Sequence, residues 1–169
     1  MDLKVLDFPS QKYICKKYGG DNISPAVSWN KIPNAKSYAL IIEDPDAVGN
    51  NFIHWYIPYI SKNIERIDSL CFLDIANINS NIKKINLNKI SIFFGKNSFD
   101  KFGYTGPCPP KGTGIHRYNI ILYALDNILN IKKKYLKIKD SNQFIDILKE
   151  NNISIIEKSH IIFEYSYYK

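Results

Sequence analysis

The sequence lacks a long hydrophobic run. No segment of its 169 residues comes near the roughly eighteen uninterrupted apolar residues that a membrane-spanning helix needs. The first twelve residues also contain Asp2, Lys4, Asp7 and Pro9, where a secretory signal peptide would need an apolar stretch. We therefore expect a protein that does not span a membrane and that resides in the cytoplasm.

Cysteine is scarce, and its three occurrences are far apart in the chain. Cys15, Cys71 and Cys108 show neither a paired spacing nor a Cys-x-x-Cys motif. Paired spacings are typical of disulfide frameworks, and Cys-x-x-Cys pairs are typical of zinc sites. The sequence therefore indicates neither a disulfide framework nor a zinc site, and a reducing compartment fits this pattern best.

Motifs of common enzyme classes are missing as well. The chain has no Gly-x-Ser-x-Gly elbow, and its histidines lack the His-x-His and His-x-x-x-His spacings that bring two metal ligands together. Cys108 lies among prolines with no evident residue to orient it as a nucleophile. The stretch from Gly106 to Gly114 is not a P-loop, because its order is Lys-Gly-Thr and a strand follows it. We expect a non-enzymatic protein with no metal and no cofactor, in which this stretch is a rigid rim or an ordered connection.

The composition is that of one folded domain with a basic surface. Hydrophobic residues make up 45% of the chain and aromatic residues 14%, which is enough apolar area for one core. We find no repeat and no linker, so residues 1–169 are expected to form a single domain. The net charge of +7 would attract nucleic acid, anionic lipid and acidic protein alike. Because the lysine clusters are short, we expect a solvated basic face and no nucleic-acid partner, while peripheral contact with an anionic membrane stays open.

Most of the expected secondary structure is β. Short runs rich in apolar, β-branched and aromatic residues lie between Gly, Pro, Asn and Asp, and they predict buried strands at 37–43, 52–60, 90–94 and 118–125. Apolar residues alternate over 161–168, which predicts a strand with one buried face. The expected fold class is mostly β, a two-sheet antiparallel β-sandwich with a few peripheral helices.

One helix and one long excursion complete the expected order. A helix is predicted from Ser141 to Asn151, because three apolar residues follow an Asp or Ser cap at helical spacing: Phe144, Ile147 and Leu148. The segment from Ser61 to Lys89 has no clean period and is rich in Asn and Lys. It is expected to be a surface excursion with at most one short helical turn, supplied by Ile64, Ile67, Leu70 and Phe72.

Two of the three histidines and two aspartates are the candidate site residues. His54 lies just inside an expected strand, His116 lies just before another, and Asp44-Pro45-Asp46 directly follows a third. Asp44 and Asp46 can both be turn residues bonded to local amides, or Asp46 can lie in the turn while Asp44 faces a pocket. A single histidine among apolar neighbours is more often a core residue than a ligand. The two histidines taken with the two aspartates nevertheless indicate a site.

Three stretches of the sequence occur together in one known family. They are Ser24-Pro25-Ala26-Val27-Ser28-Trp29, then Asp44-Pro45-Asp46-Ala47 with His54-Trp55, then Gly103-Tyr104-Thr105-Gly106-Pro107-Cys108-Pro109-Pro110 with Gly114-Ile115-His116-Arg117-Tyr118. With them the chain resembles the phosphatidylethanolamine-binding proteins, which include Raf kinase inhibitor protein, and is similar to their compact, bacterial-type branch. The resemblance implies a β-sandwich with a small anion pocket at one end. By position it implies the pocket residues Asp44, His54, Gly106, His116 and Tyr118.

The resemblance and the chemistry of these side chains together suggest roles. Phosphoryl oxygens would receive hydrogen bonds from the rings of His54 and His116, the hydroxyl of Tyr118 and backbone amides near Gly106 and Gly112. Asp44 would fix the orientation of a histidine or receive the ammonium group of the ligand. Arg117 points away from its two neighbours on a strand, so we expect a structural ion pair there.

The expected function is binding of phosphate, phosphorylethanolamine or a phospholipid head group without turnover. A regulatory protein that docks on a kinase or a protease, with the pocket as its ligand-controlled switch, is the alternative. A hydrolase that uses the same pocket is a weaker one. Head-group binding needs His54 and His116, docking needs a surface patch, and an enzyme needs turnover.

Overall fold

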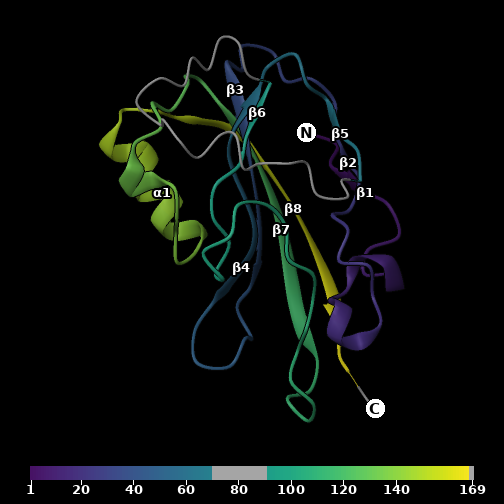
Figure 1. The fold of residues 1–169 in the computed structure, drawn as a ribbon. Helices are drawn as coiled ribbons and strands as arrows, with labels where there is room; N and C mark the ends of the chain where they lie inside the picture. The colour runs from purple at the N-terminus through teal and green to yellow at the C-terminus, as the bar shows by residue number, and fades with distance from the viewer. Residues whose placement is uncertain (70–90, 168–169) are drawn as a thin grey trace.

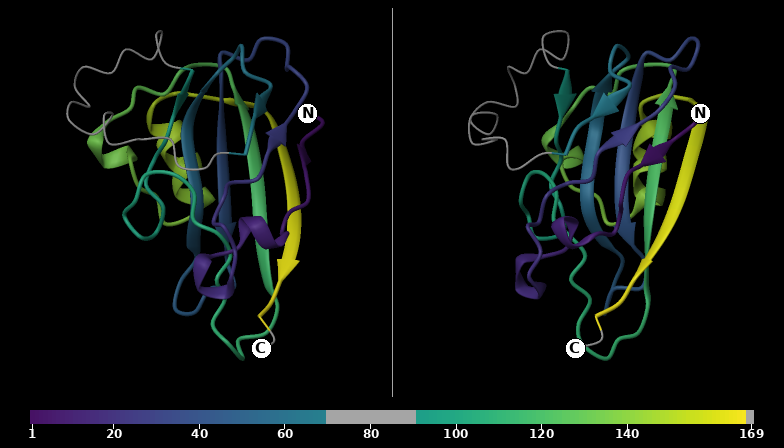
Figure 2. Two further views of the ribbon diagram at one scale, coloured as in Figure 1. Left: turned by 45° about the vertical axis from the view of Figure 1, so that its right-hand side comes forward. Right: turned by 90° about the vertical axis from the view of Figure 1, so that its right-hand side faces the viewer.

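The fold has three layers, and the structure, a computed structural model, describes residues 1–69 and 91–167. A five-stranded antiparallel sheet is the middle layer. A three-stranded antiparallel sheet lies on one side of it, and helix α1 (Ser141–Glu150) lies on the other (Figures 1 and 2). Two antiparallel sheets with few helices confirm the predicted β-sandwich.

The strands of each sheet are not in sequence order. The five-stranded sheet has the order β6-β4-β3-β7-β8, with bounds Ile92–Phe93, Phe52–Ser61, Ser37–Asp44, His116–Leu125 and Ile155–Tyr165. The three-stranded sheet has the order β1-β2-β5, with bounds Lys4–Val5, Val27–Ser28 and Arg66–Ile67. Short 3₁₀ turns lie at Gln11–Tyr13 (η1), Lys16–Tyr18 (η2) and Lys133–Tyr135 (η6).

The middle strand β3 is apolar along its whole length because both of its faces are covered. All eight of its residues are buried. Tyr38, Leu40 and Ile42 pack in the core shared with the three-stranded sheet, whereas Ala39 and Ile41 pack in the core under α1. A strand buried on both faces reads as a continuous hydrophobic run, which is the signal that predicted this element.

Helix α1 confirms the predicted segment and its buried face. Asp140 is the N-cap, and its carboxylate accepts a hydrogen bond from the backbone N–H of Gln143 at 2.8 Å. The three predicted apolar residues are buried against the sheet: Phe144, Ile147 and Leu148. Glu43 of β3 accepts hydrogen bonds from the backbone and hydroxyl of Ser141, so the helix begins at a fixed place on the sheet.

Three strands differ from their predicted extents. Strand β8 begins at Ile155, six residues earlier than predicted. Residues 157–160 are polar on both faces and give no apolar alternation, although their backbone pairs with β7. Strand β7 begins at His116, so the histidine is part of the strand, and β6 has only two residues. Ile67 lies in β5 and not in a helical turn. Leu70 and Phe72, predicted for that turn, lie outside the described residues.

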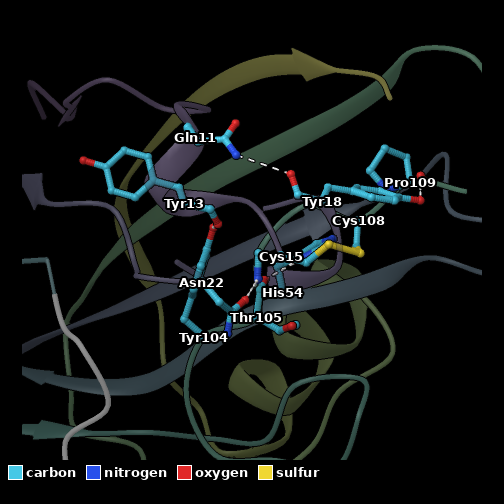
Figure 3. The surroundings of a disulfide bond; sticks show 11 residues. Gln11, Tyr13, Cys15, Tyr18, Asn22, His54, Tyr104, Thr105, Cys108 and Pro109 are labelled. Atoms are coloured by element: carbon cyan, nitrogen blue, oxygen red, sulfur yellow. Dashed lines mark hydrogen bonds between the residues drawn. A yellow bond between two sulfur atoms is a disulfide. The ribbon is translucent and has the colours of Figure 1, made fainter. Parts of the chain in front are cut away.

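The prediction of no disulfide is wrong. Cys15 and Cys108 are joined by a disulfide bond, although 93 residues separate them in the chain (Figure 3). A backbone hydrogen bond joins the same two segments, since the N–H of Cys15 donates to the carbonyl of Pro107 at 3.0 Å. The spacing of these two cysteines in the sequence could not predict the disulfide, because only the fold brings them together. Cys71 lies outside the described residues.

Candidate functional site

The candidate site is a pocket at one end of the five-stranded sheet, where β3 ends and where β4 and β7 begin. Its cavity volume of about 190 Å³ is below the roughly 300 to 1,000 Å³ of drug-sized sites, so it suits a small group. All five predicted residues line it: Asp44, His54, Gly106, His116 and Tyr118. The other lining residues are Ala47, Val48, Phe52, Phe99, Cys108, Pro109 and Pro110. Among the described lining residues there is no lysine and no arginine.

A buried hydrogen-bonded chain crosses one wall of the pocket. The Nδ1 atom of His116 lies 2.7 Å from Oδ2 of Asp44, and both side chains are almost completely buried. On the other side of the ring, Nε2 lies 2.8 Å from the hydroxyl of Thr113. The same hydroxyl lies 2.7 Å from the carbonyl of Pro110. The carboxylate of Asp44 can only accept, so Nδ1 of His116 donates to it, and Asp44 fixes the ring, which is the first of its two predicted roles.

His54 is held differently. Its Nδ1 lies 2.7 Å from the backbone carbonyl of Thr105, and because a carbonyl can only accept, Nδ1 carries the hydrogen. Burial of the ring is the main cause that lowers the pKa of His54 to about 4, so the ring is neutral near pH 7. Its Nε2 atom is then an acceptor, and none of the described residues forms a hydrogen bond with it. This geometry differs from the prediction that both histidines donate to a phosphate.

Tyr118 contributes the unpaired donor of the pocket. Its side chain is fully buried, and its hydroxyl has no hydrogen-bond partner among the described residues. Burial, followed by the nearby charge of Asp44, raises the pKa of Tyr118 well above its usual value. The hydroxyl therefore keeps its proton at every physiological pH. A buried O–H without a partner is costly, and this hydroxyl is the side-chain donor that a bound ligand can satisfy.

Gly106 lines the pocket, but its backbone N–H is already used. That N–H donates to the side-chain oxygen of Asn22 at 2.7 Å. A Cβ atom at this position would lie 2.1 Å from the carbonyl oxygen of Tyr13, so no larger residue fits here without movement. Gly106 therefore serves close packing of the N-terminal segment against the rim, and the predicted amide cradle is not free. Gly112 is not among the lining residues.

The second aspartate forms the predicted ion pair on the outer side of the same corner. Arg117 donates to both carboxylate oxygens of Asp46, at 2.8 and 2.7 Å from its side chain and 2.9 Å from its backbone. The hydrogen bonds from Arg117 are the main cause that lowers the pKa of Asp46 to about 2. Asp46 is thus the turn residue and Asp44 faces the pocket, as one of the two sequence interpretations had it.

Comparison with known proteins decides the family. The family described as phosphatidylethanolamine-binding protein matches residues 4–165 of this chain. The chain belongs to the phosphatidylethanolamine-binding protein family. A relative, the UPF0098 protein PH1269 of Pyrococcus horikoshii, is 36% identical over 139 residues, which cover 78% of this chain and 64% of that relative.

Solved structures of this family have the same fold. The phosphatidylethanolamine-binding protein homolog CT736 from Chlamydia trachomatis matches with a TM-score of 0.70 and 25% identity, covering 98% of this chain and 96% of that one. YbcL of Escherichia coli matches with a TM-score of 0.72 and 21% identity, covering 98% of both chains. At that identity the likeness to YbcL shows the fold alone.

Three residues that were not predicted as site residues complete the pocket. Thr105 and Thr113 hold the two histidines, and Asn22 holds the rim. Thr105 lies within the third family stretch, Thr113 precedes His116 by three residues, and Asn22 carries no sequence signal. In the described ranges 1–69 and 91–167, no group of three or more His, Cys, Asp or Glu side chains could hold a metal ion. No helix within those ranges is long and apolar enough to cross a membrane.

Proposed function

We propose that this phosphatidylethanolamine-binding protein binds the phosphate group of a small molecule or of a phospholipid head group in the pocket at Asp44, His54, His116 and Tyr118. The unpaired, fully buried hydroxyl of Tyr118 at the pocket wall carries this proposal. The family name, and that of CT736, describe proteins that bind phosphatidylethanolamine. The small volume of the pocket also fits one phosphate group better than a large organic ligand.

Some pocket residues would contact the ligand, and others would keep the pocket in shape. The O–H of Tyr118 donates to one phosphoryl oxygen. Asp44 keeps the ring of His116 in place at the pocket wall, with Nε2 on the hydroxyl of Thr113. Apolar side chains such as Phe52 and Phe99 lower the local dielectric and strengthen the bond from Tyr118.

We infer that the pocket binds without turnover. Catalysis by a nucleophile needs a free hydroxyl or thiol beside a base. Cys108 is bonded to Cys15, and the hydroxyl proton of Thr113 points at a carbonyl. The hydroxyl of Tyr118 is unpaired, but burial raises its pKa, so it keeps its proton and is a poor nucleophile. The cytoplasmic location stays a prediction, and the disulfide removes the argument from unpaired cysteines that supported it, because such bonds persist mainly in oxidising compartments.

Calorimetric titration tests the proposal. Wild-type protein should bind inorganic phosphate and phosphorylethanolamine at pH 5.5, and Tyr118→Phe should weaken both by about 1 kcal/mol, since it removes one hydroxyl at constant shape. His160→Ala, at an exposed position of β8 distant from the pocket in sequence and not among its lining residues, is the control and should bind as the wild type does. Failure of the wild type to bind either ligand at millimolar concentration would refute the proposed function.

A further inference from the structure

The polar atoms that face the pocket are mostly acceptors. The carboxylate of Asp44 and the Nε2 atom of His54 can accept hydrogen bonds, whereas the only unoccupied side-chain donor among the described lining residues is the hydroxyl of Tyr118. The N–H of Gly106 is taken by Asn22, and both ring nitrogens of His116 have partners. An anion whose oxygens can only accept hydrogen bonds would place them against the lone pairs of Asp44 and of Nε2 of His54, which is unfavourable.

The acceptor role of His54 follows from geometry. Its Nδ1–H points at the carbonyl of Thr105, and reversing the tautomer would set the Nδ1 lone pair against that carbonyl oxygen at 2.7 Å. The ring is also fixed by its contacts, since it lies against Phe52 and Tyr118 with centroids 4.7 and 5.2 Å away. Nε2 therefore offers a lone pair to any ligand that reaches it.

We propose that the pocket selects phosphate groups that carry a proton, with the P–OH donating to Nε2 of His54 while Tyr118 donates to an unprotonated oxygen. This proposal rests on the proposed function and specifies its ligand as a phosphate monoester monoanion or inorganic phosphate. Sulfate and phosphodiesters lack such a proton near neutral pH and are poor ligands. Of the ligands in the proposed function, the pocket therefore selects inorganic phosphate and monoesters such as phosphorylethanolamine over the diester of an intact phospholipid. A phosphoester dianion would leave Nε2 without a donor and add charge beside Asp44.

The pH dependence of binding follows from the ligand. The groups that face His54 are Asp44 from β3 and His116 and Tyr118 from β7. The second pKa of a phosphate monoester is about 6, so the monoanion fraction, and with it the affinity, falls roughly 25-fold between pH 5.5 and 7.5. Titration of a protein group would also change the affinity, but at a midpoint that is the same for every ligand.

The experiment compares ligands with different proton chemistry by calorimetric titration of the wild-type protein between pH 5.5 and 8. Methyl phosphate, which has no ammonium group, should bind tightest at pH 5.5. Methylphosphonate, whose second pKa is higher, should hold its affinity to higher pH. Sulfate and dimethyl phosphate should bind at least tenfold more weakly than methyl phosphate at pH 5.5. Equal midpoints for the ester and the phosphonate, or equal affinities for sulfate and methyl phosphate, would overturn the proposal.

A matched variant tests the role of His54. In His54→Asn the amide nitrogen can replace Nδ1 and keep the bond to Thr105, while the acceptor at Nε2 is lost. We expect weaker methyl phosphate binding and a preference over sulfate of less than threefold, with an unchanged circular dichroism spectrum; His160→Asn should behave as the wild type does. If His54→Asn keeps the wild-type preference, His54 is not the acceptor and the proposal fails. These outcomes differ from failure of the proposed function, in which methyl phosphate does not bind at all.

Discussion

Two aspartates in the Asp-Pro-Asp turn pair with two consecutive residues of β7, and the two pairs lie in opposite environments. Asp44 holds His116, and the exposed fractions of their side chains are 4% and 1%. Asp46 holds Arg117, and the corresponding fractions are 28% and 56%. Consecutive residues of a strand face opposite sides, so one corner of the chain supplies both a buried pair and a solvated one.

The comparison shows that the alternation of side chains along β7 assigns the two pairs to different tasks. One pair faces the pocket, and the other stabilises the turn outside it. The buried pair lines the pocket, where a missing partner would leave an uncompensated polar group in a medium of low dielectric. The solvated pair closes the outside of the corner, where water and salt weaken it. We therefore expect the two pairs to respond very differently to substitution.

The largest effect should come from the buried pair. Asp44→Ala leaves the ring of His116 buried without its acceptor, and we expect a loss of about 3 to 5 kcal/mol of unfolding free energy. Urea denaturation at pH 7 measures it. The same truncation at Asp46 is the matched comparison, and equal losses at both positions would show that burial does not distinguish the pairs.

An intermediate effect should come from the far end of the buried chain. Thr113→Val keeps the shape of the side chain but removes the hydroxyl that lies 2.8 Å from Nε2 of His116, which should cost about 1 kcal/mol of unfolding free energy. Thr113→Ser retains the hydroxyl and should lie within a few tenths of a kcal/mol of the wild type. A serine variant as unstable as the valine variant would assign the effect to the lost methyl group and not to the hydrogen bond.

The smallest effect should come from the solvated pair. Asp46→Asn should cost about 0.2 to 1 kcal/mol of unfolding free energy at pH 7 and low salt, and less in 1 M salt. Because folding lowers the pKa of Asp46 from 3.8 to about 2, this contribution is present above pH 4 and is lost as the pH falls towards 2. Urea denaturation of both proteins from pH 2 to 7 measures the difference. A difference that does not shrink at low pH would mean that the ion pair is not its source.

Burial periodicity explains what the sequence predicts well. The strands around Leu40, Tyr56 and Leu122 are covered on both faces, so their apolar runs are long and their positions are predicted to within a residue or two. The face of α1 that carries Phe144 has the same kind of signal. Strand β8 was predicted only in its second half, because an edge strand with alternating exposure has little apolar pattern where polar residues occupy both faces.

The site is predicted in its residue types but not in its hydrogen bonds. Family motifs indicate that His54 and His116 lie together, and the pocket contains both. Their hydrogen bonds depend on the carbonyl of Thr105 and the hydroxyl of Thr113, and neither backbone carbonyls nor tautomers are visible in a sequence. The hydrogen bond from the N–H of Gly106 to Asn22 joins residues that are 84 positions apart in the sequence, so only the fold reveals it.

The disulfide between Cys15 and Cys108 closes residues 15–108 into a covalent ring, with a short N-terminal tail that contains β1 and a long C-terminal tail. The ring contains β2 to β6 and with them Asp44, His54 and Gly106, whereas the C-terminal tail contains β7, α1 and β8 and with them His116 and Tyr118. The pocket is thus shared between two parts that are joined only through residue 108 and the exposed loop after it. A single cut in the ring leaves one covalent molecule until a reductant is added. A cut in the loop at 110–115 removes the covalent link between the two halves of the pocket while the disulfide is intact, and only the pairing of β3 with β7 and the packing then hold them together.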